Sequence, residues 1–281
     1  MRRIHYNDIV DKVRDICIDA NYNLSKDVIA AYEKALETEK SPLGQEVLKQ
    51  IMENAEIAKN ENMPLCQDTG LAVFFVELGQ EVYIAGGLFN DAINEGVRQG
   101  YNKGLLRKSV VQEPLFERRN TSDNTPAIIY TELVAGDQIK IMLDIAGGGC
   151  ENMAAHKMLK PAEGIEGVRK FVVDTVKNAG ANPCPPVIVG VGIGGDFEKS
   201  AMLAKKALLR PVGQPHQRLE VASLEEDLLK RVNQLGIGPV GLGGIVTAFA
   251  VHVEIHPCHI ASLPVAVNIG CHSSRHKSVI I

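Results

Sequence analysis

Residues 62–70 read NMPLCQDTG, and this stretch places a thiol, an amide, a carboxylate and a hydroxyl in a row before a glycine. A packed core does not accommodate Gln67, Asp68 and Thr69 side by side, because buried polar groups must find partners. The next residues, LAVFFVEL (71–78), form a near-continuous apolar run that is typical of a buried strand. We therefore expect a loop that presents chemical groups directly before a central strand.

The rest of the chain predicts an α/β fold in which a helical amino-terminal part packs with a small mixed β-sheet flanked by helices. Apolar spacing makes the first ~60 residues helical, with a third helix beginning at Ser41-Pro42. Further strands are expected at 127–133 and 139–146, which could form a hairpin, and at 186–193, 245–255 and 263–269. Further helices are expected at 165–179, at 197–209 and after a capping box formed by Ser223 and Glu226. We find no repeat or linker, so we expect residues 1–281 to form a single domain.

Composition narrows the classes of partner. The chain of 281 residues carries a net charge of -4, which gives no reason to expect nucleic acid or an anionic membrane as a partner. The amino terminus lacks the apolar core of a signal peptide, and no apolar run reaches the ~20 residues of a spanning helix. We expect a cytoplasmic protein.

The cysteines are spread along the chain and none forms a C-x-x-C pair. They are Cys17, Cys66, Cys150, Cys184, Cys258 and Cys271. This spacing excludes zinc ribbons, thioredoxin-like dithiols and ferredoxin-type cluster runs, so the ligands of any bound metal come from distant loops. Cys17 is predicted to be structural, and HPCH (256–259) is open to a metal or a hydrogen-bonding interpretation.

Glycines and polar residues gather where the predicted strands begin or end. The segments are AGGGCEN (146–152), NPCPP (182–186) and NIGCHSSRH (268–276). Each contains a cysteine beside residues that stiffen or free the backbone, as in loops that bind ligands. One further pattern, G-x-G-x-x-G at 190–195, follows a strand and precedes a helix, as in dinucleotide-binding folds. Its first two glycines fall inside the strand and no acidic residue ends a following strand, so nicotinamide binding is the weaker interpretation.

Six segments in order carry a family resemblance. They are CQDTG (66–70), NTSDNTP (120–126), AGGGCEN, NPCPP, HIASLPVAVNIGC (259–271) and the following SSRH. Together they resemble the α subunit, or amino-terminal domain, of the class I iron-sulfur hydro-lyases, which are oxygen-sensitive fumarases and L-tartrate dehydratases. The resemblance covers nearly the whole chain.

The resemblance implies a [4Fe-4S] cluster as cofactor, held by cysteines that match Cys66, Cys184 and Cys271 on loops at one end of the fold. Three protein ligands leave one iron without a protein ligand, and that iron can act on the substrate as a Lewis acid. An electron-transfer cluster would normally have all four irons ligated by protein.

The resemblance also implies roles for the residues around the cluster. Asp68 would exchange a proton with the hydroxyl that leaves or enters. The substrate-binding residues would be Gln67, Arg107, Gly149 and His259. Arg107 suits a carboxylate because its planar guanidinium matches one, although from the residues alone it reads as a solvated surface charge.

The function implied is reversible hydration of fumarate to L-malate, a step of the tricarboxylic acid cycle, with L(+)-tartrate dehydratase as the alternative. The base and further cationic side chains of the family come from a β subunit, so we expect a heteromer, as a heterotetramer, that binds a small dicarboxylate. Two hypotheses from other classes are an iron-sulfur electron carrier and an NAD-binding oxidoreductase.

Overall fold

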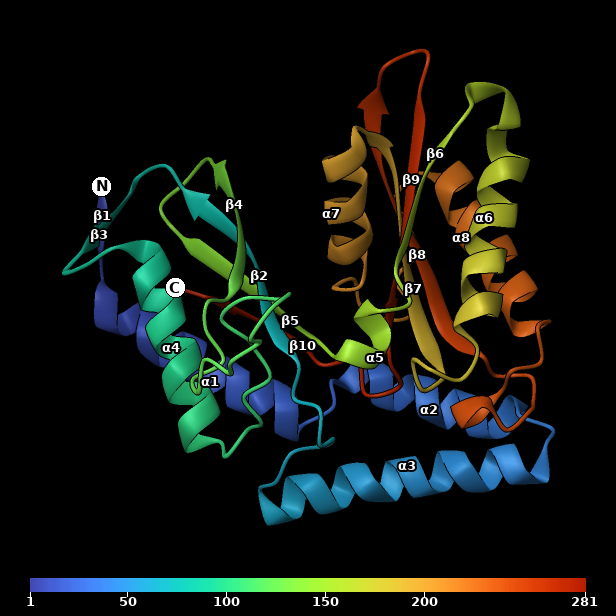
Figure 1. Ribbon diagram of the computed structural model, residues 1–281, viewed down its shortest axis with the longest axis horizontal. Helices are drawn as coiled ribbons and strands as arrows, with labels where there is room; N and C mark the ends of the chain where they lie inside the picture. The colour runs from blue at the N-terminus through green and yellow to red at the C-terminus, as the bar shows by residue number, and fades with distance from the viewer. The chain divides into compact units, whose positions relative to one another are not determined.

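The computed structural model describes residues 1–281, and its internal contacts divide the chain into two compact units (Figure 1). The first unit comprises Met1–Ser25, Asn54–Gly148 and Arg275–Ile281, and the second comprises Lys26–Glu53 and Gly149–Ser274. The fold is α/β, as the sequence predicts. That the two units act as one domain over 1–281 stays a prediction.

A four-stranded sheet in the order β10-β5-β2-β4 forms the centre of the first unit. Its strands are β2 (Leu71–Gly79), β4 (Ile128–Val134), β5 (Ile139–Ala146) and β10 (His276–Ile280). The predicted hairpin between β4 and β5 is wrong, because β2 lies between them, parallel to β4 and antiparallel to β5. Five consecutive buried residues in β2, from Ala72 to Val76, explain why it takes the inner position.

Helices α1 (Tyr6–Tyr22) and α4 (Phe89–Lys103) share one core with this sheet. A Cβ at Gly96 would lie 2.5 Å from Cβ of Val13, so glycine lets α4 approach α1 closely. A short parallel pair, β1 (Arg2–His5) and β3 (Val82–Ala85), completes the unit. The sequence analysis did not predict α4, β1, β3 or β10.

The second unit contains a mixed sheet in the order β6-β9-β7-β8 with helices on both faces. Its strands are β6 (Ala155–Leu159), β7 (Val187–Gly195), β8 (Ala248–Cys258) and β9 (Leu263–Gly270). Helices α6 (Gly164–Ala179) and α8 (Leu219–Asn233) cover one face, and α7 (Phe197–Ala207) covers the other (Figure 1). Odd-numbered residues of β7, such as Val189, join the core beneath α6 and α8, and Ile188 joins the small core on the α7 side.

Helices α2, α3 and α5 and two 3-10 turns complete the secondary structure. Helix α2 (Lys26–Thr38) belongs to the second unit, and both α3 (Pro42–Glu61) and the single turn α5 (Gly148–Glu151) cross a unit boundary. Two 3-10 turns lie at Pro161–Glu163 and Pro239–Gly241. No helix combines the length and the apolar character that crossing a membrane requires.

The start of α8 differs from the prediction. The helix begins at Leu219 and not after a cap at Ser223, which lies inside it. Val221 extends the buried stripe of Leu224, Leu228 and Val232 by one residue at helical spacing, so burial of this stripe favours the earlier start.

The glycines of the G-x-G-x-x-G pattern allow α7 to pack closely on β7. A Cβ at Gly190 would lie 2.1 Å from the carbonyl oxygen of Ala204, and one at Gly192 would lie 2.0 Å from that of Ser200. No side chain fits at either distance, so helix packing by itself accounts for both glycines.

Gly192→Ala should therefore destabilise the second unit by roughly 1–3 kcal/mol, the usual cost of overpacking a core. Thermal unfolding of the cluster-free chain measures this change. Gly270→Ala is the matched control, because its Cβ would meet nothing closer than 3.7 Å. Equal melting temperatures for the two variants would contradict the packing explanation.

Candidate functional site

The CQDTG turn is held rigidly by the residues at its carboxyl end. Thr69 is 1% exposed, and its hydroxyl donates a hydrogen bond of 3.0 Å to the carbonyl oxygen of Arg107. The buried Tyr101 hydroxyl of α4 donates to the carbonyl oxygen of Thr69 at 2.6 Å. Gly70 has φ of +59°, and a Cβ there would lie 2.6 Å from a backbone oxygen, so only glycine fits. Thr69 and Gly70 are thus structural, and they fix the three residues before them.

The Asp68 carboxylate is oriented by two backbone amides. Oδ1 accepts from the N–H of Gly70 at 3.0 Å, and Oδ2 accepts from the N–H of Gly148 at 2.8 Å. Its backbone carbonyl accepts from the Arg275 guanidinium at 2.5 Å. Asp68 remains partly exposed, so a carboxylate of fixed orientation faces solvent.

Cys66 and Gln67 directly precede this carboxylate in the turn. Arg107 is bound to the turn through its backbone carbonyl oxygen. Cys66 is partly exposed, and its thiol lies 3.4 Å from Oε1 of the exposed Gln67. The Arg107 side chain is exposed and makes no hydrogen bond or ion pair. Because Thr69 binds the Arg107 backbone, this cation is anchored to the CQDTG turn with its guanidinium available to an anion.

In the second unit, the loops that contain Gly149, Cys184 and Cys271 come together at one end of the sheet. The N–H of His272 donates to the carbonyl oxygen of Cys184 at 3.1 Å. A Cβ at Gly149 would lie 3.0 Å from the carbonyl oxygen of Asn182, two residues before Cys184. Cys184 is exposed with φ of +55°, and Cys271 is partly exposed. The structure therefore presents two of the three predicted thiols from adjoining loops.

Cys258 and His259 lie at the opposite end of the same sheet. Cys184 precedes the start of β7, whereas Cys258 pairs with Gly195 at the end of β7. A strand rises about 3.3 Å per residue, so the stretch from Val187 to Gly195 separates these ends by about 26 Å. His259 is exposed, and its Nδ1 accepts from the N–H of Ala261 at 3.1 Å. This histidine and the thiols of Cys184 and Cys271 cannot contact one small substrate within the same chain.

The three predicted ligand thiols have the accessibility that a metal ligand requires. None of the six cysteines is in a disulfide. Burial raises the pKa of the Cys17 thiol, which disfavours the thiolate that iron binds, and Cys150 is also buried. Cys66, Cys184 and Cys271 are all accessible and lie on loops. No three His, Cys, Asp or Glu side chains lie close enough together to hold a metal ion. Cys66 belongs to the first unit, whereas Cys184 and Cys271 belong to the second.

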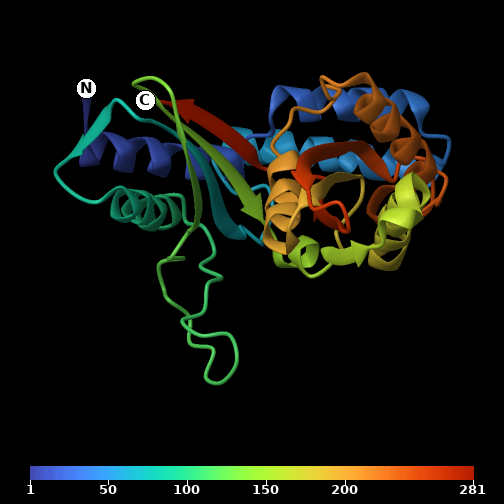
Figure 2. The ribbon, with the colours of Figure 1, turned by 90° about the horizontal axis from the view of Figure 1, so that it is seen from above.

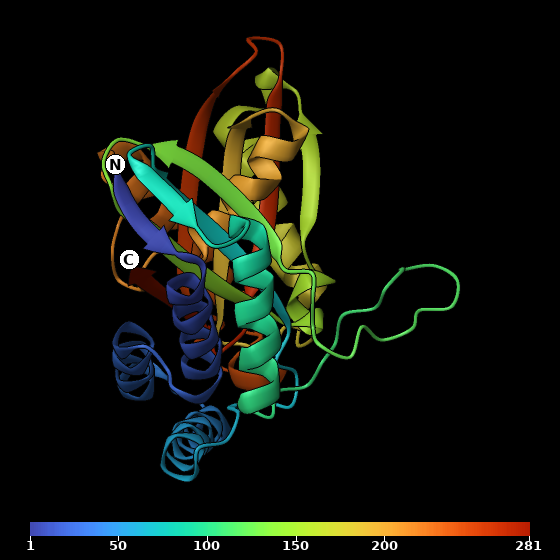
Figure 3. The same ribbon diagram turned by 90° about the vertical axis from the view of Figure 1, so that its left-hand side faces the viewer.

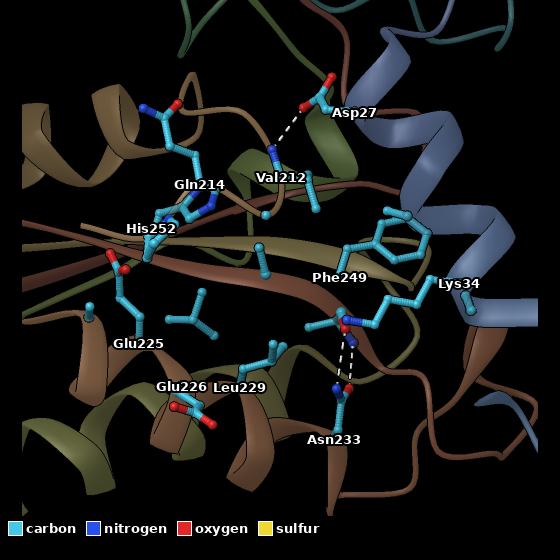
Figure 4. A pocket seen from close by; sticks show the side chains of 18 of the residues that line it. Asp27, Lys34, Val212, Gln214, Glu225, Glu226, Leu229, Asn233, Phe249 and His252 are labelled. Carbon is cyan, nitrogen blue, oxygen red and sulfur yellow. Dashed lines mark hydrogen bonds between the residues drawn. The ribbon is translucent and has the colours of Figure 1, made fainter. Parts of the chain in front are cut away.

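A cavity of about 730 Å³ in the second unit contains none of the predicted site residues (Figure 4). It lies between α2, α8 and β8 and is lined by residues that include Lys34, Leu229 and Phe249. His252 also lines it, and burial lowers the pKa of this histidine to about 4, so it is neutral at physiological pH. The carboxylate of Glu225, beside it, is already bound to Arg210.

Three residues with a positioning role were not predicted from the sequence. They are Tyr101, Asn124 and Arg275, each of which contacts the CQDTG turn or the residues next to it. Arg275 is 4% exposed, and it also donates to Oδ1 of Asn21 at 3.2 Å. The motifs NTSDNTP and SSRH contain Asn124 and Arg275, so the motifs were a signal, but which of their residues turn inward depends on tertiary contacts.

Comparison with known proteins defines the class to which this chain belongs. The chain belongs to the fumarate hydratase (Fumerase) family, whose profile matches residues 10–280. This is a family of hydro-lyases.

Several relatives match over nearly the full chain, among them the following two. The chain is 42% identical over 271 residues to the putative L(+)-tartrate dehydratase subunit alpha of Methanocaldococcus jannaschii, and the match covers 95% of each protein. It is 34% identical over 279 residues to the L(+)-tartrate dehydratase subunit alpha of Escherichia coli K12, covering 98% of this chain and 91% of that protein.

Proposed function

We propose that this chain is the α subunit of a [4Fe-4S]-dependent hydro-lyase that acts on a four-carbon dicarboxylate, with fumarate plus water to L-malate as the first candidate reaction. The observation that carries the proposal is the Asp68 carboxylate, which two backbone amides orient beside Cys66 and Gln67 in a member of this family. A fixed, partly exposed carboxylate can deliver and accept a proton at one position.

Cys66, Cys184 and Cys271 would hold the cluster. When bound, the iron without a protein ligand would supply a Lewis acid to the substrate hydroxyl and one carboxylate. Asp68 would protonate the departing hydroxyl of malate, and in the hydration direction it would take a proton from water.

Binding of the substrate carboxylates would fall to side chains that the structure leaves available. The exposed Arg107 guanidinium has no internal partner and would form paired hydrogen bonds with a carboxylate. Gln67 would donate from its amide nitrogen, and the exposed Gly149 would donate from its backbone N–H. These groups bring one cationic side chain to a substrate with two negative charges.

A β subunit would supply what is missing. The matched residues include no second arginine and no base for the proton on the carbon beside the other carboxylate, so catalysis should need a partner chain. The names of the relatives, which are α subunits, support this reading. We propose a heterotetramer of two α and two β chains.

The decisive experiment compares the chain alone with the chain plus its β subunit, both reconstituted anaerobically with iron and sulfide. We expect hydration of fumarate only when both are present. Turnover of fumarate at an enzymatic rate by this chain alone would overturn the split site, and inactivity of the pair on every dicarboxylate would overturn the hydro-lyase.

L(+)-tartrate dehydration to oxaloacetate is the second candidate, because the names of both relatives specify tartrate. The HIASLPVAVNIGC segment resembles fumarases and favours the first candidate. Measuring kcat/KM for fumarate, L-malate and L(+)-tartrate with the same pair ranks the two. A ratio above about 100 in either direction exceeds the discrimination that an apolar pocket achieves against one added hydroxyl, and it identifies the preferred substrate.

His259 would donate to the substrate of a second copy in this heterotetramer, since it lies at the end of the sheet away from Cys184 and Cys271. When assembled with β, tetramers in which both α chains carry His259→Ala should be inactive. The same should hold when both carry Cys184→Ser. Mixed tetramers that contain one copy of each should recover up to about half of the wild-type activity, because one of their two sites is intact. A randomly assembled mixture, in which about half of the tetramers are mixed, should therefore recover about a quarter. No recovery on mixing would assign His259 to its own chain, and full activity of His259→Ala would remove its role.

A further inference from the structure

Residues 108–122, here named the arm, extend from the first unit away from α4 and the β2–β4 strands (Figures 2 and 3). The arm is an ordered hairpin and not a slack loop. Val111 and Asn120 form an antiparallel bridge. Two backbone hydrogen bonds flank it, from the N–H of Gln112 to the carbonyl oxygen of Arg119 at 2.8 Å and from the N–H of Thr121 to the carbonyl oxygen of Val110 at 2.9 Å. Its conformation is therefore set by its own backbone.

A single carboxylate organises the tip of the arm. Glu113 accepts the backbone N–H groups of Leu115 at 2.9 Å, Phe116 at 2.7 Å and Arg118 at 2.5 Å. These hydrogen bonds, that of Phe116 foremost, lower the pKa of Glu113 to about 2, so the carboxylate is charged throughout the physiological range. The tip is consequently fixed before any partner arrives.

This fixed tip presents large apolar side chains to solvent. Leu115 is 72% exposed and Phe116 is 84% exposed. Two adjacent apolar side chains that a fixed backbone holds outward lose little conformational entropy on binding, so the tip is suited to insertion into another protein. The sequence around the tip is basic, although the chain as a whole has a net charge of -4. Residues 103–119 contain five cationic and two acidic side chains.

The arm is rooted at the CQDTG turn. Oδ1 of the fully buried Asn124 accepts the N–H of Ser109 at 2.7 Å, and its Nδ2 donates to the carbonyl oxygen of Gly70 at 3.1 Å. Thr69 binds the backbone of Arg107, the residue that precedes the arm. Any chain that covers the turn to complete the active site is therefore within reach of the arm.

We propose that the arm is the docking element for the β subunit, and that Leu115 and Phe116 insert into an apolar socket with an acidic rim on that subunit. This inference rests on the proposed function, because it takes the partner that completes the site as the occupant. The preorganised tip limits the entropy lost on binding. The acidic rim would compete with Glu117, which pairs with the exposed Arg119 at 2.8 Å in the free chain. A second copy of this chain is the competing occupant.

The first test measures the dissociation constant of the purified α and β chains. Leu115→Ser combined with Phe116→Ser should weaken the complex at least 10-fold, which is the scale expected when an aromatic anchor is removed. Leu88→Ser is the matched control, because Leu88 is 71% exposed in the same unit and outside the arm, and it should change nothing. Glu113→Gln should weaken the complex by a smaller factor, since an amide holds the three N–H groups less firmly.

The second test identifies the neighbour directly. A photoreactive phenylalanine analogue at position 116 of the assembled complex should crosslink to the β subunit, with the crosslinked peptide lying near acidic residues. A crosslink to another α chain, no crosslink, or unchanged affinity of the double variant would each overturn the proposal. If the wild-type pair assembles and hydrates its substrate in those cases, only the role of the arm fails; if the wild-type pair is inactive, the proposed function fails independently.

Discussion

Cys184→Ser and Cys271→Ser should each abolish the visible absorbance of the anaerobically reconstituted cluster, together with all hydratase activity. A serine hydroxyl is a poorer ligand for iron than a thiolate, and with three protein ligands the loss of one leaves two. Cys66→Ser should do the same. Iron and sulfide content, measured beside the absorbance, gives a readout that does not depend on activity.

Cys258→Ser is the matched control for this prediction. Cys258 is as accessible as Cys184, yet it lies at the other end of β7, so its replacement should leave the iron content unchanged. Cys17 and Cys150 are buried and should also be dispensable for the cluster. Loss of the cluster in Cys258→Ser, with retention in Cys271→Ser, would show that the ligands are assigned to the wrong end of the sheet.

Asp68→Asn should lower kcat at least ~100-fold while the cluster absorbance stays at the wild-type level, because an amide of the same shape cannot transfer the proton. The structure adds a second expectation. Both carboxylate oxygens accept a backbone N–H, from Gly70 and from Gly148, so the amide nitrogen of asparagine leaves one of these donors without its acceptor. Thermal unfolding measured on the same sample separates this loss from the loss of catalysis.

Asp137→Asn serves as the control, since Asp137 is an exposed aspartate of the same unit outside the turn. It should retain full activity. Wild-type kcat in Asp68→Asn would remove Asp68 from proton transfer and would leave its carboxylate with the structural role of fixing the turn.

Local sequence patterns predicted most of the helices and strands. The apolar run 71–78 became β2, and the periodic stretch 165–179 became α6 within one residue, because burial on a sheet or helix face leaves a regular spacing. The patterns failed where a long-range choice decided the outcome. β4 and β5 have the spacing of a hairpin, but the more hydrophobic β2 lies between them in the sheet. Nothing in residues 127–146 indicates that another strand pairs with both.

The sequence by itself determined the family and the chemistry available to it: the thiols, the Gln67-Asp68 pair, and the glycines that closely packed backbone requires. Only the tertiary structure decided which groups are held and where. It bound both Asp68 oxygens to amides, buried Arg275 against the Asp68 carbonyl, separated His259 from Cys184 by the length of a strand, and fixed Phe116 in solvent. The reason is physical, since residue type sets what a group can do, whereas orientation and proximity come from contacts between residues as far apart as 68 and 275, which a linear pattern does not encode.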